Sequence, residues 1–230
     1  MKVNPYLEGE ILVVDKPLKW TSFDVVNKIR YSIKDKYKIK KIKVGHAGTL
    51  DPLATGVVVI CTGKKTKIIN DFLLQDKEYT GKIQLGSTTP SFDLETSVDK
   101  HYKVPEIDKK KINFLVEIFS GEIDQIPPIY SAKRINGKRA YDFARANEKV
   151  VLAPNKVVIK ELELQLESKN VLSFYCKCSK GTYIRALARD IGLALDSGAF
   201  LIELRRIKSG NFSIEDAKSI DDWVDIIKTS

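Results

Sequence analysis

The chain has 230 residues, enough to bury a substantial core as one large domain or two small ones. Its contents of 43% hydrophobic and 30% charged residues are normal for a folded, water-soluble protein and exclude wholesale disorder. Lysine and arginine total 39 against 30 acidic residues. The net charge of +9 suits either a polyanionic partner such as nucleic acid or a basic surface that only faces water.

No segment of the sequence predicts export or membrane insertion. The N-terminus, MKVNPYLEGE, lacks the apolar stretch of a signal peptide, and no apolar run approaches the roughly 20 residues of a membrane helix. The three cysteines are an odd number without the spacing of a disulfide framework, which fits a reducing compartment. We therefore expect a cytoplasmic protein with no membrane partner.

The first third of the chain alternates buried strands with amphipathic helices. Strands are predicted over residues 11–17 and 56–61, and a helix with Ser22 as its N-cap is predicted over residues 22–34. A second helix is predicted over residues 64–75. The apolar stripe of the first helix consists of Val25, Val26, Ile29 and Ile33, and that of the second consists of Ile68, Ile69, Phe72 and Leu73.

The rest of the chain predicts a half-buried strand, an antiparallel hairpin and several helices. The strand over residues 77–87 places Tyr79 on its inward face, and residues 160–167 and 171–179 form the hairpin. Helices are predicted over residues 109–121, ended by Gly121, and over residues 180–195, capped by Thr182. A Pro-Pro loop, an Asn-Gly turn and a short helix are predicted within residues 126–146. The mixture favours the α+β class, with a central mixed, largely antiparallel sheet flanked by helices and loops.

Two cysteines of the hairpin allow two interpretations. Cys176 and Cys178 alternate in register with Leu172 and Phe174, which predicts buried packing. The alternative is a metal site completed by a histidine, His46 or His101, although a lone C-x-C is a weak zinc signal. We favour packing and expect no metal.

The loop GHAGTLDPLATG carries a single carboxylate, Asp51, just ahead of a predicted buried strand. A conventional glycosidase needs paired carboxylates, and a carboxylate metal site needs several oxygen ligands. The spacing of Gly56 and Gly63 fails that of a phosphate-binding P-loop. Two possibilities remain open: Asp51 acts alone as a nucleophile or base, or the loop is an ordinary turn without catalysis.

Arg185 stands out because it lies in the first turn of a predicted helix, where the helix dipole disfavours a cation. It is either solvated or bound to a carboxylate or phosphate, for which its planar fork is suited. If its partner is Asp51, the ion pair keeps that carboxylate ionised at neutral pH.

Five ordered segments resemble the successive motifs of the bacterial TruB-type tRNA pseudouridine-55 synthases. The resemblance extends over about residues 9–217, and it is carried by residues 45–67, 77–86, 125–145, 178–192 and 198–207. It implies a pseudouridine-synthase-like catalytic domain and an isomerase that converts a uridine in the tRNA T loop to pseudouridine after base flipping. It implies no cofactor and no metal.

The resemblance also implies roles for single residues. Asp51 is the catalytic aspartate, and Arg185 of the K-G-T-Y-I-R motif pairs with it. Tyr79 stacks on the target base, His46 contacts the flipped nucleotide, and Tyr183 lines the uridine pocket.

Two further positions match family motifs. Leu204 corresponds to the leucine whose backbone touches the base, and Lys16 belongs to the K-P motif that supports the catalytic loop. The lysines of residues 34–43 and 133–139 are candidates for phosphate contacts, which would make affinity salt-dependent.

Two departures from the family pattern affect RNA binding. Where the family has a T-D-T-x-D segment, this chain reads TTPSFD, keeping Thr89 and Asp93 and putting local RNA contacts there in doubt. Residues 219–230 are too few for a separate C-terminal RNA-binding domain of the PUA type, and a terminal helix packed on the rest is expected instead. We therefore predict one catalytic domain over residues 1–230, a monomer, and a weaker grip on the acceptor arm.

Two other functional classes stay open from the sequence. One is a tRNA-binding folding factor for which modification is secondary. The other is an RNA glycoside hydrolase, which would release free uracil and leave an abasic site, whereas an isomerase leaves the mass of the RNA unchanged.

Overall fold

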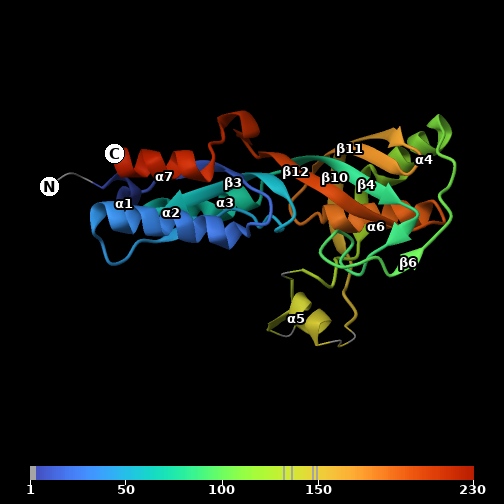
Figure 1. Ribbon diagram of the computed structural model, residues 1–230, viewed down its shortest axis with the longest axis horizontal. Helices are drawn as coiled ribbons and strands as arrows, with labels where there is room; N and C mark the ends of the chain where they lie inside the picture. Colours follow the sequence, from blue (N-terminus) through green and yellow to red (C-terminus); the bar gives the residue numbers. More distant parts are fainter. Residues whose placement is uncertain (1–3, 132, 136, 147, 149) are drawn as a thin grey trace. The chain divides into compact units, whose positions relative to one another are not determined.

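The computed structural model describes residues 4–131, 133–135, 137–146, 148 and 150–230 (Figure 1). The chain divides into two compact units. The first contains Met1–Tyr79 and Leu204–Ser230, and the second contains Thr80–Glu203. The strands β4 (Lys77–Leu85) and β12 (Ala199–Ser209) contribute residues to both units. The prediction of a single catalytic domain stays a prediction.

The sheet of the first unit has the strand order β1-β3-β12. β1 (Ile11–Lys16) and β2 (Val44–His46) run antiparallel to β3 (Thr55–Thr62), and the end of β12 runs parallel to β3. β13 (Phe212–Ser213) pairs with β12. Residues 57–61 of β3 are completely buried because both faces of this strand are covered.

The N-cap of the helix α2 (Ser22–Tyr37) lies one residue earlier than predicted. Thr21 is the N-cap and forms a capping box with Asp24, so Ser22 as N-cap was wrong. The predicted apolar stripe is confirmed, because its four members are all at most 1% exposed. Ser22 does not cap the helix, and its side chain is buried at 2% exposure.

The predicted helix over residues 64–75 is broken into two short pieces, a 3₁₀-helix η1 (Gly63–Ile68) and α3 (Ile69–Leu73). Ile69 and Phe72 pack against the core cluster around Val57 and Val59. Ile68 and Leu73 are 38% and 36% exposed, so the predicted four-residue stripe was half wrong. The 3₁₀ turn changes the angular spacing of side chains and rotates these two residues outward.

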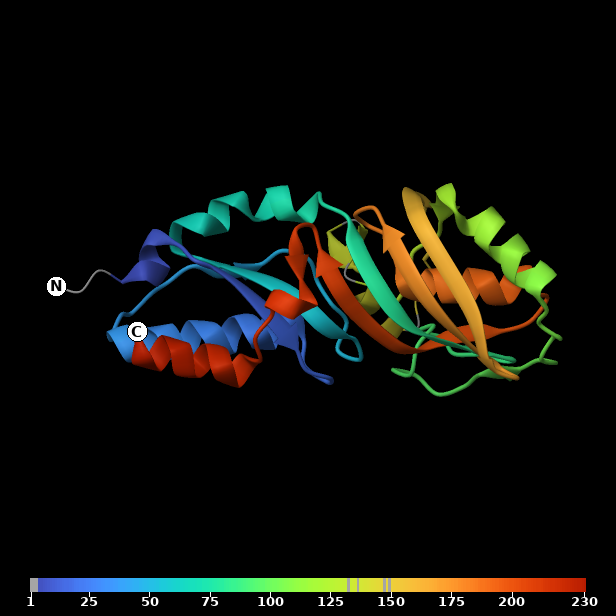
Figure 2. The same ribbon diagram turned by 90° about the horizontal axis from the view of Figure 1, so that it is seen from above.

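The chain ends in the predicted terminal helix, α7 (Ile220–Thr229), which follows a short 3₁₀-helix η2 (Ile214–Asp216). α7 lies beside α2 in both ribbon views (Figures 1 and 2). Trp223 Nε1 donates a hydrogen bond of 2.8 Å to the Val13 carbonyl, and Ile227 is completely buried. The helix is therefore part of the core of the first unit. Among the described residues of this unit, a further helix is the single turn α1 (Pro5–Glu8).

The second unit has the strand order β12-β4-β11-β10-β7. β10 (Asn155–Ser168) and β11 (Val171–Cys178) form the predicted antiparallel hairpin, and β7 (Gly121–Gln125) pairs antiparallel with β10. The buried packing of Cys176 and Cys178 is confirmed. Tyr79 at the start of β4 is 8% exposed, as its predicted inward face requires. Together, the two units confirm a mixed, mostly antiparallel sheet flanked by helices.

Two helices accompany this sheet, α4 (Lys109–Phe119) and α6 (Ile184–Ala194). Tyr183, not Thr182, is the N-cap of α6, because the Thr182 hydroxyl instead donates to the Ser179 carbonyl at 2.9 Å. Two small strand pairs complete the unit, β5 (Ser87–Thr88) with β6 (Lys100–His101) and β8 (Arg134–Ile135) with β9 (Lys138–Arg139). The short helix α5 (Ala140–Arg145) follows them. Of the predicted Asn-Gly turn, Asn136 lies outside the described residues.

Candidate active site

Asp51 lies in the connection between β2 and β3, at the turn that leads into the buried strand. The Ala54 amide donates to the Asp51 carbonyl at 3.1 Å and closes this turn. Gly48 and Gly56 frame the loop with φ of +108° and +106°, a backbone conformation that glycine adopts without strain. Residues Leu50 and Ala54 are buried on either side, while Asp51 itself is half-buried. The loop thus presents one carboxylate from a firmly seated backbone.

Ser22 holds the residue immediately before the carboxylate. Its hydroxyl accepts a hydrogen bond of 2.8 Å from the Leu50 amide and donates one of 3.2 Å to the Leu50 carbonyl. Both backbone groups of Leu50 are therefore satisfied by one buried side chain from α2.

Lys16 holds Pro52, the residue immediately after the Asp51 carboxylate. Its ammonium group donates to the carbonyls of Trp20 at 2.6 Å, Pro17 at 3.0 Å and Pro52 at 3.4 Å. The side chain is 0% exposed, and burial lowers the pKa of Lys16 to about 8 against the opposing attraction of Asp51. The K-P segment at the end of β1 therefore contacts the loop, and its role in catalysis stays a prediction.

Arg206 supports the loop from β12. Its guanidinium donates to the carbonyls of Val57 at 2.7 Å, Gly48 at 3.1 Å and Thr49 at 3.4 Å. Its charge also adds to the forces that lower the pKa of both Lys16 and His46.

His46 lies at the end of β2, where its backbone pairs with Ile60 of β3. Burial lowers the pKa of its imidazole, a hydrogen bond with the Gly48 backbone opposes this, and Arg206 adds a smaller lowering. The imidazole is therefore neutral at pH 7 and can both donate and accept a hydrogen bond.

The predicted site residues fall in both units. Lys16, His46, Asp51, Tyr79 and Leu204 belong to the first unit, and Tyr183 and Arg185 belong to the second. Leu204 is 7% exposed and precedes Arg205, which pairs with Thr55 at the start of β3. The pairing of Asp51 with Arg185 stays a prediction.

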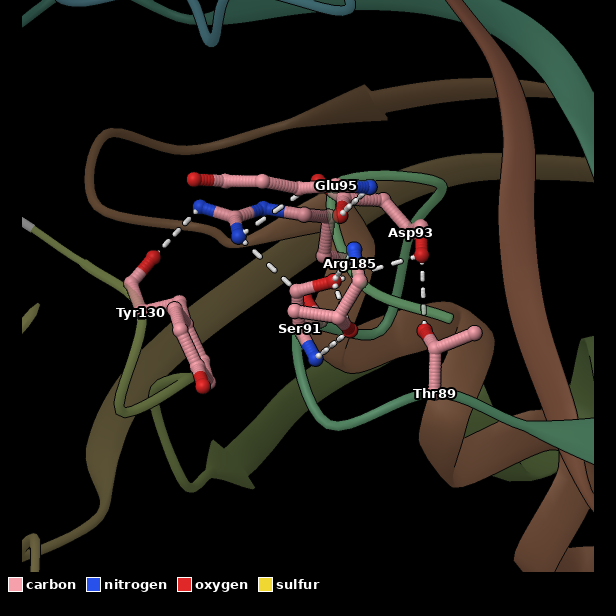
Figure 3. Close-up of polar contacts among 7 residues, drawn as sticks. Thr89, Ser91, Asp93, Glu95, Tyr130 and Arg185 are labelled. Carbon is pink, nitrogen blue, oxygen red and sulfur yellow. Dashed lines mark hydrogen bonds and ion pairs between the residues drawn. The ribbon is translucent and has the colours of Figure 1, made fainter. Parts of the chain in front are cut away.

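Arg185 is 4% exposed and is oriented within the second unit by three contacts (Figure 3). Its guanidinium donates to the carbonyls of Tyr130 at 2.9 Å and Ser91 at 3.2 Å, and it lies 3.5 Å from the Asp93 carboxylate. Thr89 in turn donates to the Asp93 carbonyl at 2.7 Å. The cation that looked misplaced at a helix start is thus compensated by a carboxylate and two carbonyls.

The segment TTPSFD therefore has an interior role in this structure. Thr89, Ser91 and Asp93 are at most 5% exposed, and they contact one another and Arg185 rather than presenting a polar surface (Figure 3). Nearby, Gln125 is buried and accepts a hydrogen bond of 2.8 Å from the Tyr183 amide. This bond fixes the start of α6.

The sequence patterns do not single out Ser22 or Arg206 as parts of the site. The pair Thr21 and Asp24 is a sequence signal for a capping box, and it would have released Ser22 from the cap. No local signal identifies Arg206, because its partners lie about 150 residues away in the chain. Among the described residues, no group of three or more His, Cys, Asp or Glu could hold a metal ion. Nor is any helix of this part long and apolar enough to cross a membrane.

Comparisons with known proteins assign this architecture. Residues 34–184 match the model of the TruB family pseudouridylate synthase N-terminal domain, and residues 185–229 match that of the tRNA pseudouridylate synthase B C-terminal domain. The chain belongs to the TruB family of pseudouridylate synthases. It is therefore an enzyme of the isomerase class.

The sequences of curated relatives match this chain along nearly the whole length of both proteins. The tRNA pseudouridine synthase B of Phocaeicola vulgatus is 53% identical over 96% of this chain and 95% of its own, and that of Chloroherpeton thalassium is 43% identical over 97% and 92%. Among solved structures, a Cbf5-Nop10-Gar1 complex matches with a TM-score of 0.70 and 28% identity. The match covers 96% of this chain and 54% of that one, so this chain spans about half of that neighbour.

Proposed function

We propose that this pseudouridine synthase acts on tRNA and isomerises the uridine at position 55 of the T loop. The curated relatives, named tRNA pseudouridine synthase B, are matched over most of their length and support tRNA as the substrate. The observation that carries the proposal is the seating of the Asp51 loop. Ser22, Lys16 and Arg206 fix its backbone on both sides of one half-buried carboxylate.

In the proposed reaction, the target uridine leaves the RNA stack before chemistry begins. Extrusion costs a few kcal/mol, which stacking on an aromatic ring and phosphate contacts offset. Asp51 then drives cleavage of the bond between N1 and C1′, the uracil rotates, and C5 bonds to C1′ while its proton is lost and N1 gains one. The same carboxylate serves attack at C1′, addition at C6, or removal of a sugar proton.

The remaining site residues bind and orient the nucleotide in this proposal. Tyr79 stacks on the uracil, neutral His46 contacts the flipped nucleotide, and Tyr183 and the Leu204 backbone line its pocket. Arg185 pairs with Asp51 in this proposal. The three contacts of its guanidinium support this role, because they hold the cation in one orientation.

A cation-lined pocket of the first unit supports the RNA part of the proposal. The pocket, of about 630 Å³, lies between the 34–43 segment and η1. Its cations are Arg30, Lys34, Lys40, Lys41, Lys43, Lys64 and Lys67. Such a concentration of positive charge suits the phosphates of an RNA backbone. We name it the lysine pocket.

The test is incubation of the protein with unmodified tRNA, followed by mapping of pseudouridine and assay of free uracil. We expect pseudouridine at the T-loop uridine and no free uracil. Release of uracil would indicate a glycoside hydrolase instead.

Asp51→Asn separates modification from binding. We expect it to abolish pseudouridine formation while tRNA affinity stays near that of the wild type, since the amide keeps the size of the side chain but is neither nucleophile nor base. A variant that modifies tRNA like the wild type would contradict the role of Asp51. The cytoplasmic location and the monomeric state stay predictions, which fractionation and light scattering can check.

A further inference from the structure

We propose that Arg206 is a positioning residue that holds the Asp51 loop in its reactive shape. The inference rests on the proposed catalytic role of Asp51. Nothing in the resemblance assigns a role to Arg206, and its position at the far end of β12 gives no hint of one in the sequence.

The geometry of the guanidinium carries the proposal. Its Nη2 and Nη1 atoms bind the carbonyls of Gly48 and Thr49, which precede Asp51, while Nε binds the carbonyl of Val57, which follows it. One rigid fork therefore ties together the two ends of the loop. An ammonium group on a flexible stem has no comparable planar fork to match these acceptors.

The burial of Arg206 indicates that the residue does not serve mainly to stabilise the fold. The residue is 1% exposed, and within the described part of the chain its guanidinium forms no ion pair, only hydrogen bonds to carbonyls. A buried charge without a counter-ion costs solvation free energy, and an apolar side chain of similar volume often serves stability as well or better. What an apolar side chain cannot do is bind three carbonyls at once.

The backbone of Arg206 packs closely against β3, just as its side chain packs closely against the loop. Arg206 pairs with Gly56 in the parallel contact of β12 with β3, and a Cβ atom on Gly56 would lie 2.2 Å from the Arg206 carbonyl oxygen. This close approach of the two backbones places the Arg206 guanidinium within hydrogen-bonding distance of the loop carbonyls. Small displacements of a reacting group reduce rates steeply, so a loop that relaxes without its fork should slow the reaction.

The experiment compares wild type, Arg206→Met and Arg206→Lys in single-turnover pseudouridine formation and in tRNA binding. We expect Arg206→Met to lower the rate constant about tenfold to a hundredfold, with tRNA affinity within about twofold of wild type. Arg206→Lys should give an intermediate rate, because it restores the charge but not the fork. Thermal melts establish the folded fraction of each variant.

The neighbouring arginine supplies a matched control. Arg205 forms a bidentate pair with Asp15 at 2.7 and 3.1 Å and contacts Thr55, but it does not touch the carbonyls of the loop. We expect Arg205→Met to keep a rate within about twofold of wild type at equal folded fraction. Amide hydrogen exchange over residues 48–57 should accelerate in Arg206→Met and not in Arg205→Met.

Each outcome decides the proposal. A wild-type rate in folded Arg206→Met, an equal rate loss in Arg205→Met, or a loss confined to tRNA affinity would overturn it. If Arg206→Met does not fold, a wild-type rate in Arg206→Lys overturns it and a reduced rate at full folding supports it. If wild-type protein forms no pseudouridine, the proposed function fails, and the hydrogen exchange comparison alone decides whether Arg206 holds the loop.

Discussion

Lys16 carries a positive charge into the protein interior, and its surroundings do not fully compensate that charge. Burial lowers its pKa from the usual 10.5 to about 8, although the nearby Asp51 carboxylate raises it and Arg206 lowers it further. Three carbonyls accept its hydrogen bonds. Burying a lysine in this position costs folding free energy, which fits a residue whose role is to support the loop.

The shifted pKa of Lys16 predicts a pH dependence of stability. Between pH 8 and 10.5 the folded chain has released this proton and the unfolded chain still binds it, so the free energy of unfolding rises with pH. Lys16→Met removes this contribution. We expect the stability of wild type relative to Lys16→Met to rise by on the order of 3 kcal/mol across this window, measured by urea unfolding at several pH values. A difference independent of pH would contradict the shift.

A second prediction at the residue scale concerns Ser22. Ser22→Ala leaves the amide and the carbonyl of Leu50 without their buried partner. We expect a loss of about 1–3 kcal/mol in the free energy of unfolding, measured by denaturant titration. Ser32→Ala on the same helix is the control, because its hydroxyl only donates to the Lys28 carbonyl at the surface, and about 0.5 kcal/mol or less is expected there. Equal effects of the two changes would contradict the role of Ser22.

At the scale of elements, the junction of β3 with β12 positions the loop. The parallel contact is short and includes only the pairs Arg205 with Thr55 and Arg206 with Gly56. It nevertheless brings β12 against the strand that follows Asp51. The close approach at Gly56 is what makes this register specific, since any side chain there meets the backbone of β12.

Gly56→Ala tests this junction. The added methyl group meets the Arg206 backbone at 2.2 Å and also forces alanine into φ of +106°. Gly121→Ala is the matched control, because Gly121 has φ of +87° but nothing within 4 Å of an added Cβ. We expect Gly121→Ala to cost about 1–2 kcal/mol through its backbone alone, and Gly56→Ala to cost clearly more or to prevent folding. Similar melting temperatures of the two variants would contradict the close approach.

At the scale of the whole molecule, the net charge of +9 includes one dense group of cations. The lysine pocket gathers seven cations from α2, the 34–43 segment and η1, with no acidic residue in its lining. Electrostatic attraction of this kind acts on the phosphate backbone without regard to base sequence. We therefore propose that the lysine pocket contributes to affinity and that the Asp51 loop carries the chemistry.

Salt dependence of tRNA binding tests this assignment. Replacing Lys40, Lys41 and Lys43 by Gln should weaken binding and reduce the slope of log affinity against log salt by up to about 3, since each phosphate contact contributes roughly 0.9. The control replaces the exposed Lys109, Lys110 and Lys111 of α4, which removes the same charge outside the lysine pocket. We expect little change in slope there. Equal slopes in both triple variants would show that only net charge matters.

Much of this protein could be predicted from its sequence because local patterns carry the physical information. The stripe of Val25, Val26, Ile29 and Ile33, the hairpin around residues 168–171 and the inward register of Tyr79 follow from side-chain periodicity, and the structure confirms them. The motif around Asp51 likewise predicted a turn that presents a carboxylate ahead of a buried strand. The family match confirms the class of reaction.

What only the tertiary structure decided is how that carboxylate is held. Ser22 lies 28 residues from Leu50 in the chain, and Arg206 lies 149 residues from Val57, so no periodicity or spacing links them. Arg185 likewise reaches across 94 residues to the Ser91 carbonyl. Hydrogen bonds form between groups that folding brings within about 3 Å of each other, whatever their separation in the sequence. The sequence by itself therefore determined which residue is predicted to do the chemistry, and the packing of distant strands and helices decided what keeps that residue in place.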